Sequence, residues 1–313
     1  MKVLFYMPHA DARAWLNDFA RALPEADVRE WRPGDTAPAD FAVVWRPPRE
    51  MLAGRDDLRA IFNLGAGVDA ILALEHEHPG MLPRAAQLIR LEDSGMAPQM
   101  AEYVSHAVLR YLRRFDEYQM LQNEHRWQVL DPHPRDTFIV GVLGLGVLGS
   151  HVAHTLAGFG LPVRGYSRGM RVVDGVATFA GQAQFDAFLD GVKVLVNLLP
   201  HTPDTRDVLD VHTFSKLARG AYLINVARGA HLVEQDLLDA LASGQLTAAT
   251  LDVFREEPLP PDHPFWREPR ITITPHVSAL TLREESVAQV AQKITALIRG
   301  ERVSGVVDIE RGY

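Results

Sequence analysis

The sequence predicts an α/β protein with two domains, each built on a parallel β-sheet that is covered by helices. Short uncharged runs rich in β-branched residues alternate with amphipathic stretches along the chain. One of these runs, 137–143, leads directly into a glycine-rich turn at 144–149. Similar runs alternate with helical stretches before residue 99, which indicates a separate α/β unit there.

The N-terminal part of the chain supplies one sheet. Its apolar runs predict strands at residues 3–6, 41–45, 61–64 and 87–89. Residues 12–22 have helical spacing, and a long helical pattern extends from residue 99 to residue 126. We expect this long helix to carry the chain into the second domain.

The second sheet begins with the run before the glycine turn. Its predicted strands are 137–143, 161–166, 193–198, 221–226, 248–253 and 271–274. The helix after the turn is expected to have Val152, Leu156 and Phe159 on one face and to stop at residues 160–162. A final helix is predicted at residues 283–298, with an apolar stripe formed by Val287, Val290, Ile294, Leu297 and Ile298.

Composition limits the classes of function. The 313 residues are 47% hydrophobic, enough for a sizeable core, and the net charge of −8 argues against a nucleic-acid partner. The absence of cysteine excludes disulfides, thiol catalysis and Cys-ligated zinc. The longest uncharged run, 137–150, is shorter than the roughly 18 residues that a membrane helix needs. We therefore expect a soluble, cytoplasmic protein that binds neither nucleic acid nor membrane.

Histidine clusters give no metal site. The His76-Glu77-His78 triplet and the helical pair His151 and His154 both lack a third ligand in a recognisable pattern. We expect these to be solvated or partly buried histidines and predict no metal.

The glycine turn has the sequence context of a dinucleotide site. Gly144, Gly146 and Gly149 form a G-x-G-x-x-G pattern between a predicted strand and a predicted helix. Glycine at these positions permits a tight turn and lets backbone N–H groups approach a pyrophosphate at the helix N-terminus. The alternative is that the glycines only allow close packing of the helix on the strand.

The end of the next strand indicates which dinucleotide binds. NAD-dependent folds place an acidic residue about 20 residues after the first glycine, on the ribose 2′-hydroxyl. Here Ser167 and Arg168 stand at that point, and the first acid afterwards is Asp174. A guanidinium suits a 2′-phosphate, so we expect NADP(H) to be preferred over NAD(H). The alternative is an ordinary solvated loop arginine.

Several motifs together resemble one known family. They lie at residues 63–69, 199–205, 224–229, 251–260, 274–276 and 311–313, and they span nearly the whole chain. With the glycine turn, they resemble the D-isomer-specific 2-hydroxyacid dehydrogenases, and within that family the glyoxylate/hydroxypyruvate reductase A group. The resemblance implies two Rossmann-like or flavodoxin-like domains with a cleft between them, and a homodimer.

The resemblance also implies a separate binding role for each domain. Residues 1–98 and 281–313 form a discontinuous substrate-binding domain, because the last helix packs back on the first domain in this family. Residues 99–280 form the NADP(H)-binding domain. Small-molecule sites commonly lie between domains, which agrees with a substrate cleft there.

Three residues carry the implied chemistry. Arg228 follows a predicted strand at its carboxyl end, and in the family this arginine contacts the substrate carboxylate and carbonyl. His276 and Glu257 match the family's proton-transfer pair, whereas the neighbouring Glu256 has no assigned role. A carboxylate on the distal ring nitrogen fixes the tautomer and favours the imidazolium. The pair is expected to act as the acid in reduction and the base in oxidation.

Further contacts follow from the resemblance. Substrate is expected at the backbone of a short glycine-containing loop and at the Trp45 side chain; the loop residues are Leu64, Gly65, Ala66 and Gly67. That loop can form a small anion nest or can be only a tight turn, and Trp45 is equally compatible with a place in the core. The expected cofactor contacts are Gly144, Gly146, Val147, Leu148, Gly149, Ser167, Arg168, Leu199, Pro200, Pro203, Val226, Ala227 and Asp252, the last at the carboxamide.

The predicted activity is the NADPH-dependent reduction of small 2-keto acids: glyoxylate to glycolate and hydroxypyruvate to D-glycerate. One alternative is another member of the family, of the D-lactate or phosphoglycerate type. The other is a nucleotide-sensing interaction protein with the same fold. Measured turnover with purified protein separates the enzymes from the interaction protein.

Overall fold

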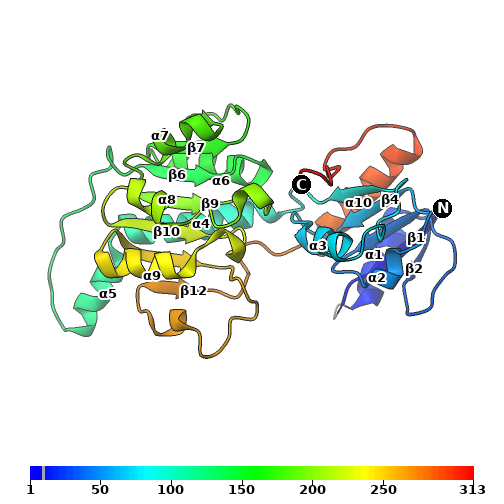
Figure 1. Cartoon of the computed structure of the whole chain (residues 1–313), viewed down its shortest axis with the longest axis horizontal. Coiled ribbons are helices and arrows are strands. Elements are labelled where there is room, and N and C mark those ends of the chain that lie inside the picture. Colours follow the sequence, from blue (N-terminus) through cyan, green and yellow to red (C-terminus); the bar gives the residue numbers. More distant parts are fainter. Residues whose placement is uncertain (9–10) are drawn as a thin grey trace. The chain divides into compact units, whose positions relative to one another are not determined.

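The computed structural model describes residues 1–8 and 11–313, which form the two compact units in Figure 1. Unit 1 comprises Met1–Gly95 and Thr281–Tyr313, and unit 2 comprises Met96–Leu280. The predicted division differs from this one only at residues 96–98. The predicted α/β class with two parallel sheets is confirmed, whereas the expected cleft between the domains stays a prediction. Within the described residues, no helix has the length and apolar character needed to cross a membrane.

Unit 1 is built on a five-stranded sheet in the order β2-β1-β3-β4-β5, and these five strands pair in parallel. Its strands are β1 (Lys2–Tyr6), β2 (Asp27–Glu30), β3 (Phe41–Val44), β4 (Ala60–Asn63) and β5 (Gln87–Arg90). Strand β2 was not predicted from the sequence. It is a charged, partly exposed edge strand, so it lacks the apolar run that marks the other strands.

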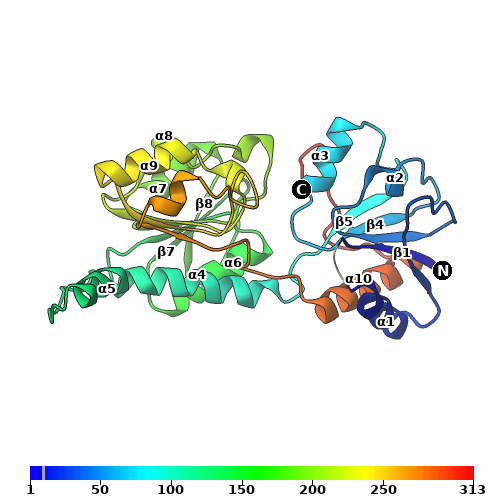
Figure 2. The ribbon, with the colours of Figure 1, turned by 90° about the horizontal axis from the view of Figure 1, so that it is seen from below.

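Helices cover both faces of this sheet, as Figure 2 shows. Helices α1 (Ala12–Ala22) and α10 (Arg283–Ile298) pack together on one face, and α2 (Arg49–Leu52) and α3 (Asp69–Glu77) lie on the other. Helices α1 and α10 have the predicted bounds. Val287, Val290 and Ile294 of the predicted stripe are buried, whereas Ile298 at the helix end is exposed.

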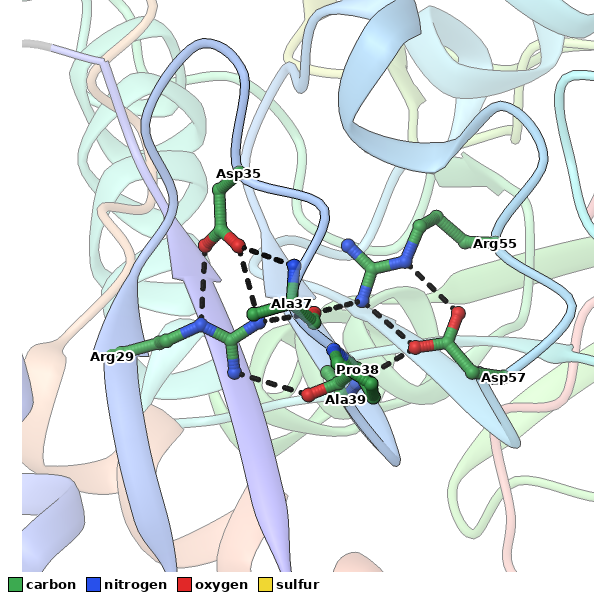
Figure 3. A network of polar contacts seen from close by, with 7 residues as sticks. All are labelled: Arg29, Asp35, Ala37, Pro38, Ala39, Arg55 and Asp57. Carbon is green, nitrogen blue, oxygen red and sulfur yellow. Dashed lines mark hydrogen bonds and ion pairs between the residues drawn. The ribbon is translucent and has the colours of Figure 1, made fainter.

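A polar network shapes the connection that precedes β3 (Figure 3). Arg55 donates to both carboxylate oxygens of Asp57 at 2.9 Å and to the carbonyl of Ala37, and Asp57 accepts from the backbone N–H of Ala39. Arg29 binds Asp35 and the same Ala37 carbonyl. The Arg55 hydrogen bond lowers the pKa of Asp57 from 3.8 to about 2. The carboxylate therefore stays ionised against a nearly buried guanidinium.

Unit 2 is built on a seven-stranded sheet in the order β12-β11-β10-β9-β6-β7-β8, again wholly parallel. Its strands are β6 (Val140–Leu143), β7 (Val163–Ser167), β8 (Val176–Ala180), β9 (Val194–Asn197), β10 (Ala221–Asn225), β11 (Leu246–Leu251) and β12 (Ile271–Ile273). The edge strand β8 was not predicted from the sequence, because most of its residues are only partly buried. Every other strand overlaps a predicted one.

Two apolar layers enclose this second sheet. Val194 and Val196 of β9 face the layer made with α4 (Met96–Leu112) and α6 (Val147–Gly158), and Leu195 faces the opposite layer. The opposite layer is covered by α7 (Phe185–Leu189), α8 (Val211–Lys216) and α9 (Glu234–Ser243). Figure 2 shows α4 and α6 on one face and α8 and α9 on the other. Four short 3₁₀ turns lie in the connections: η1 (Gln182–Gln184), η2 (Pro203–Thr205), η3 (Gly229–His231) and η4 (Pro264–Arg267).

The predicted long helix at 99–126 is wrong in one respect, because it is two helices. Helix α4 ends at Leu112, and α5 (Phe115–Asn123) begins after Arg114, whose φ of 59° is left-handed and cannot continue an α-helix. The Arg114 guanidinium donates to Glu117 and to the Asp131 carbonyl, which stabilises this break. Phe159 was expected on the same helix face as Val152 and Leu156, but it lies just beyond the end of α6 and is exposed.

Candidate active site

The predicted site residues of unit 2 gather at one edge of its sheet. Each lies in a connection that directly follows the carboxyl end of a strand, from β6 to β12. In a parallel sheet all carboxyl ends point to the same edge, which is where ligands of open α/β sheets bind. The residues that follow the strands in this way are Gly144, Arg168, Leu199, Arg228, Asp252 and His276.

The glycine turn has the shape that a dinucleotide site requires. Gly144 has a φ of +98°, and a Cβ atom there would lie 2.6 Å from the Leu198 carbonyl oxygen. Gly149 contacts the Gly144 carbonyl so closely that a Cβ would overlap it. Gly146, at the N-cap of α6, faces open space. The open position before a twelve-residue helix fits a phosphate group at the helix N-terminus.

The other expected cofactor residues surround this turn. Val147 is exposed at the start of α6, and Leu148 beside it is partly exposed. Arg168 is exposed immediately after β7, and the Ser167 hydroxyl donates to the Gly169 carbonyl at 2.8 Å. The connection after β9 contains Leu199, Pro200 and Pro203, all at least partly exposed, and Pro203 begins η2. These positions are compatible with cofactor contacts, which stay predictions.

The loop after β10 orients Arg228. The Asn225 side chain donates to the Arg228 carbonyl at 3.1 Å, and Arg228 Nη1 donates to the Ala227 carbonyl at 2.7 Å. Gly229 packs against the backbone after β11, where a Cβ atom would lie 1.9 Å from the Phe254 carbonyl carbon. Glycine at 229 therefore lets the Arg228 loop contact the loop that leads to Glu257. Val226 and Ala227, the first two residues after β10, are buried.

Glu257 and His276 form a hydrogen-bonded pair. His276 Nδ1 lies 2.8 Å from Glu257 Oε2, and Glu257 Oε1 accepts from the backbone N–H of Phe254 at 3.0 Å. Burial by itself raises the pKa of Glu257, but the bonds from His276 and Phe254 and the charge of Arg228 outweigh it and lower the pKa. The carboxylate therefore stays ionised beside the imidazole. Because Nδ1 is engaged, Nε2 is the ring atom available to a substrate.

Asp252 is fully buried below the His276 loop. Its carboxylate accepts hydrogen bonds from the Thr274 hydroxyl at 2.5 Å, the Val277 N–H at 2.9 Å and the Ser278 N–H at 2.8 Å. The Asp252 carboxylate thus binds the segment on both sides of His276, through the Thr274 side chain before it and two backbone N–H groups after it. Its expected contact with the nicotinamide carboxamide stays a prediction.

The expected substrate residues of unit 1 follow β3 and β4 at the carboxyl edge of the other sheet. The Asn63 side chain donates to the carbonyls of Gly65 at 3.1 Å and Gly67 at 2.8 Å and so shapes the loop that also contains Leu64 and Ala66. The Trp45 ring lies so close to Gly65 that a Cβ there would be 2.4 Å from the ring. Trp45 is only partly buried and its ring lies against this loop, so its expected contact with substrate stays a prediction.

Sequence reasoning missed three residues around His276. Tyr103 on α4 bonds to the Thr274 hydroxyl at 2.6 Å, and the Gln99 side chain bonds to both backbone groups of Leu280. Thr274 lies in a motif that pointed to His276, but its own role was not predicted. Spacing alone does not reveal these bonds, because Tyr103 and Thr274 are 171 positions apart.

The chain is similar in sequence to known dehydrogenases and reductases. Residues 105–278 match the family model described as the NAD binding domain of D-isomer specific 2-hydroxyacid dehydrogenases. The chain is 57% identical to a glyoxylate/hydroxypyruvate reductase A of Serratia proteamaculans, and the alignment covers 100% of both chains.

Two solved structures resemble the whole chain. A D-isomer specific 2-hydroxyacid dehydrogenase of Xanthobacter autotrophicus, in complex with NADPH and MES, has a TM-score of 0.93 at 37% identity. An NADPH-dependent glyoxylate/hydroxypyruvate reductase of Sinorhizobium meliloti, in complex with NADP and sulfate, has a TM-score of 0.90 at 36% identity. Each alignment covers 100% of this chain and 99% of the other.

Proposed function

The chain belongs to the D-isomer specific 2-hydroxyacid dehydrogenase family, and we propose that it is an NADPH-dependent reductase of small 2-keto acids. Glyoxylate and hydroxypyruvate are the proposed substrates, with glycolate and D-glycerate as products. The observation that carries the proposal is the His276–Glu257 hydrogen bond of 2.8 Å, with the charge of Arg228 acting on Glu257. A paired imidazole beside a guanidinium is what reduction of a 2-keto acid requires.

Each of the three residues has a proposed task. Arg228 binds the carboxylate and carbonyl of the keto acid through its planar set of donors. His276 donates the proton on Nε2 to the carbonyl oxygen, and in the reverse direction Nε2 accepts the proton from the hydroxyl. Glu257 holds Nδ1, so the ring keeps one orientation, with Nε2 toward the substrate.

The residues at the carboxyl edge of unit 2 fit NADP(H). Gly144, Gly146 and Gly149 leave room for the pyrophosphate at the start of α6, and Arg168 stands where a 2′-phosphate is expected. When bound, NADPH supplies the hydride that adds to C2 of the keto acid. Two solved relatives, one in complex with NADPH and the other with NADP, support this preference for NADP(H).

We also propose a homodimer that forms through α5 and the segment after it. Phe115, Met120, Trp127 and Val129 are large apolar side chains that are exposed there, and Figure 1 shows α5 projecting from unit 2. Exposed apolar patches of this kind mark interaction sites, and a second copy of the chain would cover this one. Light scattering of the wild type and of Trp127→Ser would test it. A monomeric wild type would refute it. A cytoplasmic location stays a prediction.

The proposed reductase activity is tested by measuring the turnover of a panel of keto acids by the wild type and by His276→Ala. Glyoxylate, hydroxypyruvate, pyruvate and phosphohydroxypyruvate are each assayed with NADPH and NADH. We expect the first two with NADPH to react fastest, and His276→Ala to lose about 10²- to 10⁴-fold in kcat while it still binds NADPH. A preference for pyruvate or phosphohydroxypyruvate would indicate a D-lactate or phosphoglycerate type. No turnover with any keto acid would favour a nucleotide-sensing interaction protein.

A further inference from the structure

His276 lies in a segment without regular secondary structure. The segment begins at Thr274, directly after β12, and reaches Leu280 at the end of unit 2. His276 has a φ of +56°, a left-handed conformation that costs a residue other than glycine about 1–3 kcal/mol. Backbone hydrogen bonds of a helix or strand do not hold this conformation, so other contacts must.

Asp252 supplies the first set of these contacts. Its carboxylate accepts from the N–H groups of Val277 and Ser278, and its carbonyl accepts from the His276 N–H at 2.9 Å. The two residues after His276 are therefore bound to one buried side chain. A shift of this carboxylate would move the backbone that carries the imidazole.

Tyr103 on α4 holds Asp252 through Thr274. The Thr274 hydroxyl donates its single proton to Asp252 Oδ1 at 2.5 Å, so it must accept from the Tyr103 hydroxyl, which lies 2.6 Å away. Burial, and after it the charge of Asp252, raises the pKa of Tyr103 to about 12. Tyr103 therefore keeps its proton at neutral pH and remains a donor.

Gln99 holds the other end of the segment. Its side-chain amide donates to the Leu280 carbonyl at 3.0 Å and accepts from the Leu280 N–H at 3.1 Å. Gln99 and Tyr103 are four positions apart on α4, so they lie on one face of the helix. One helix face thus binds the His276 segment at both ends.

We propose that Tyr103 and Gln99 are positioning residues that hold His276 in its catalytic orientation through Thr274, Asp252 and Leu280. The proposal rests on the proposed role of His276 as proton donor. Tyr103 acts through Thr274 and Asp252, and Gln99 acts through the backbone of Leu280. Loss of either contact is expected to lower kcat more than it raises KM, because the keto acid is held by Arg228.

Tyr103→Phe is the first test, with Tyr111→Phe as its matched control. Tyr111 lies on the same helix and donates to the Gly220 carbonyl at the same distance, 2.6 Å, but on a part of the sheet that does not carry His276. Both variants keep the aromatic ring and lose one hydrogen bond. Tyr103→Phe should lower kcat roughly 2- to 13-fold, the factor that corresponds to one net hydrogen bond. Tyr111→Phe should lower the Tm and leave kcat unchanged.

A measurement without substrate or cofactor separates positioning from a general loss of stability. Hydrogen exchange of the Val277 and Ser278 amides reports directly on their bonds to Asp252. Protection of these two amides should fall by roughly the same 2- to 13-fold in Tyr103→Phe and not in Tyr111→Phe. Gln99→Leu should give the same loss at the Leu280 amide.

Thr274 provides a rescue pair in case Tyr103→Phe does not fold. Thr274→Val removes the hydroxyl that joins Tyr103 to Asp252 and should reproduce both effects, whereas Thr274→Ser keeps the hydroxyl and should restore them. Equal kcat and equal amide protection in Tyr103→Phe and Tyr111→Phe would overturn the proposal. Full activity of His276→Ala would instead overturn the proposed function, and the exchange result would still show whether Tyr103 holds the segment.

Discussion

Replacing Glu257 by glutamine removes the negative charge from the His276 pair and keeps the size of the side chain. The carboxylate holds His276 Nδ1 with Oε2 and the Phe254 N–H with Oε1. Glutamine has one carbonyl oxygen, so it can keep only one of these two bonds as an acceptor. The variant therefore tests whether the charge on Glu257 stabilises the protonated imidazole that the proposed reduction uses.

The structure sets the size of the expected effect. A hydrogen bond to a charged group contributes about 1.5–3 kcal/mol. The side chains of His276 and Glu257 are 41% and 29% exposed, so water screens part of the attraction and the lower half of that range applies. A loss of about 1.5–2 kcal/mol corresponds to a fall of about 10- to 30-fold in kcat/KM for glyoxylate.

The pH dependence of the wild type follows from the lowered pKa of Glu257. This pKa lies below 4.5 in the folded protein. Above pH 4.5 the Glu257 carboxylate therefore makes its full contribution to the stability of the fold and of its hydrogen bond with His276. Its contribution is lost only as the pH falls through the lowered value. Protonation of Glu257 should therefore not reduce the activity of the wild type between pH 7 and pH 5, whereas Glu257→Gln should be impaired throughout.

The assay is steady-state reduction of glyoxylate with NADPH for the wild type, Glu257→Gln and the control Glu256→Gln. Glu256 is the exposed neighbour and has no assigned role, so its variant should match the wild type. NADPH binding, measured by fluorescence, should be the same in all three. If Glu257→Gln keeps more than half of the wild-type kcat/KM, or if Glu256→Gln loses as much, Glu257 does not support the proton donor.

Three further changes test other parts of the structure. Arg228→Lys keeps the charge but not the planar set of donors, and kcat/KM for glyoxylate should fall at least about 10-fold; an unchanged value would show that Arg228 does not bind the substrate. Arg168→Ala should weaken NADPH about 10- to 150-fold in a fluorescence titration and barely affect NADH, and equal weakening of both would contradict the 2′-phosphate assignment. Asp57→Asn should lower the free energy of unfolding in urea at neutral pH by about 1.5–3 kcal/mol, since Arg55 loses its carboxylate. Because the pKa of Asp57 is lowered to about 2, this difference should persist above pH 3.8 and vanish as the pH falls toward 2.

Local sequence patterns predicted the parts of the fold that depend on local causes. The interior strands of both sheets have apolar runs because both of their faces are covered, and helices α1 and α10 have clear amphipathic spacing. The edge strand β2 has neither feature, since its Asp27 and Glu30 are exposed. The break at Arg114 was also missed, because it depends on a left-handed residue and on a bond to the distant Asp131 carbonyl.

The residues of the candidate site also differ in whether local or distant contacts position them. Arg228 is bonded within its own loop, to the Asn225 side chain and to the Ala227 carbonyl, so a short motif is enough to predict where it lies. His276 has a left-handed backbone that no motif indicates, and its place depends on Asp252 and on a tyrosine 171 positions away from Thr274. The role of each residue could thus be proposed from its sequence context, but the distant contacts that orient His276 could not be predicted.

Arg228 and His276, the two proposed catalytic residues, should differ in how they respond to substitutions elsewhere in the protein. Two contacts that orient Arg228, the bonds to the Asn225 side chain and to the Ala227 carbonyl, come from neighbours in the chain, so substitutions on α4 should leave these two bonds in place. The contacts around His276 connect β11, the segment after β12 and α4, so a change in any of these three elements can reach the imidazole. Groups that share one hydrogen-bond network are expected to couple in double-mutant cycles, and groups outside it to add. Tyr103→Phe should therefore be additive with Arg228→Lys and should have little further effect on kcat once His276 has been replaced by alanine.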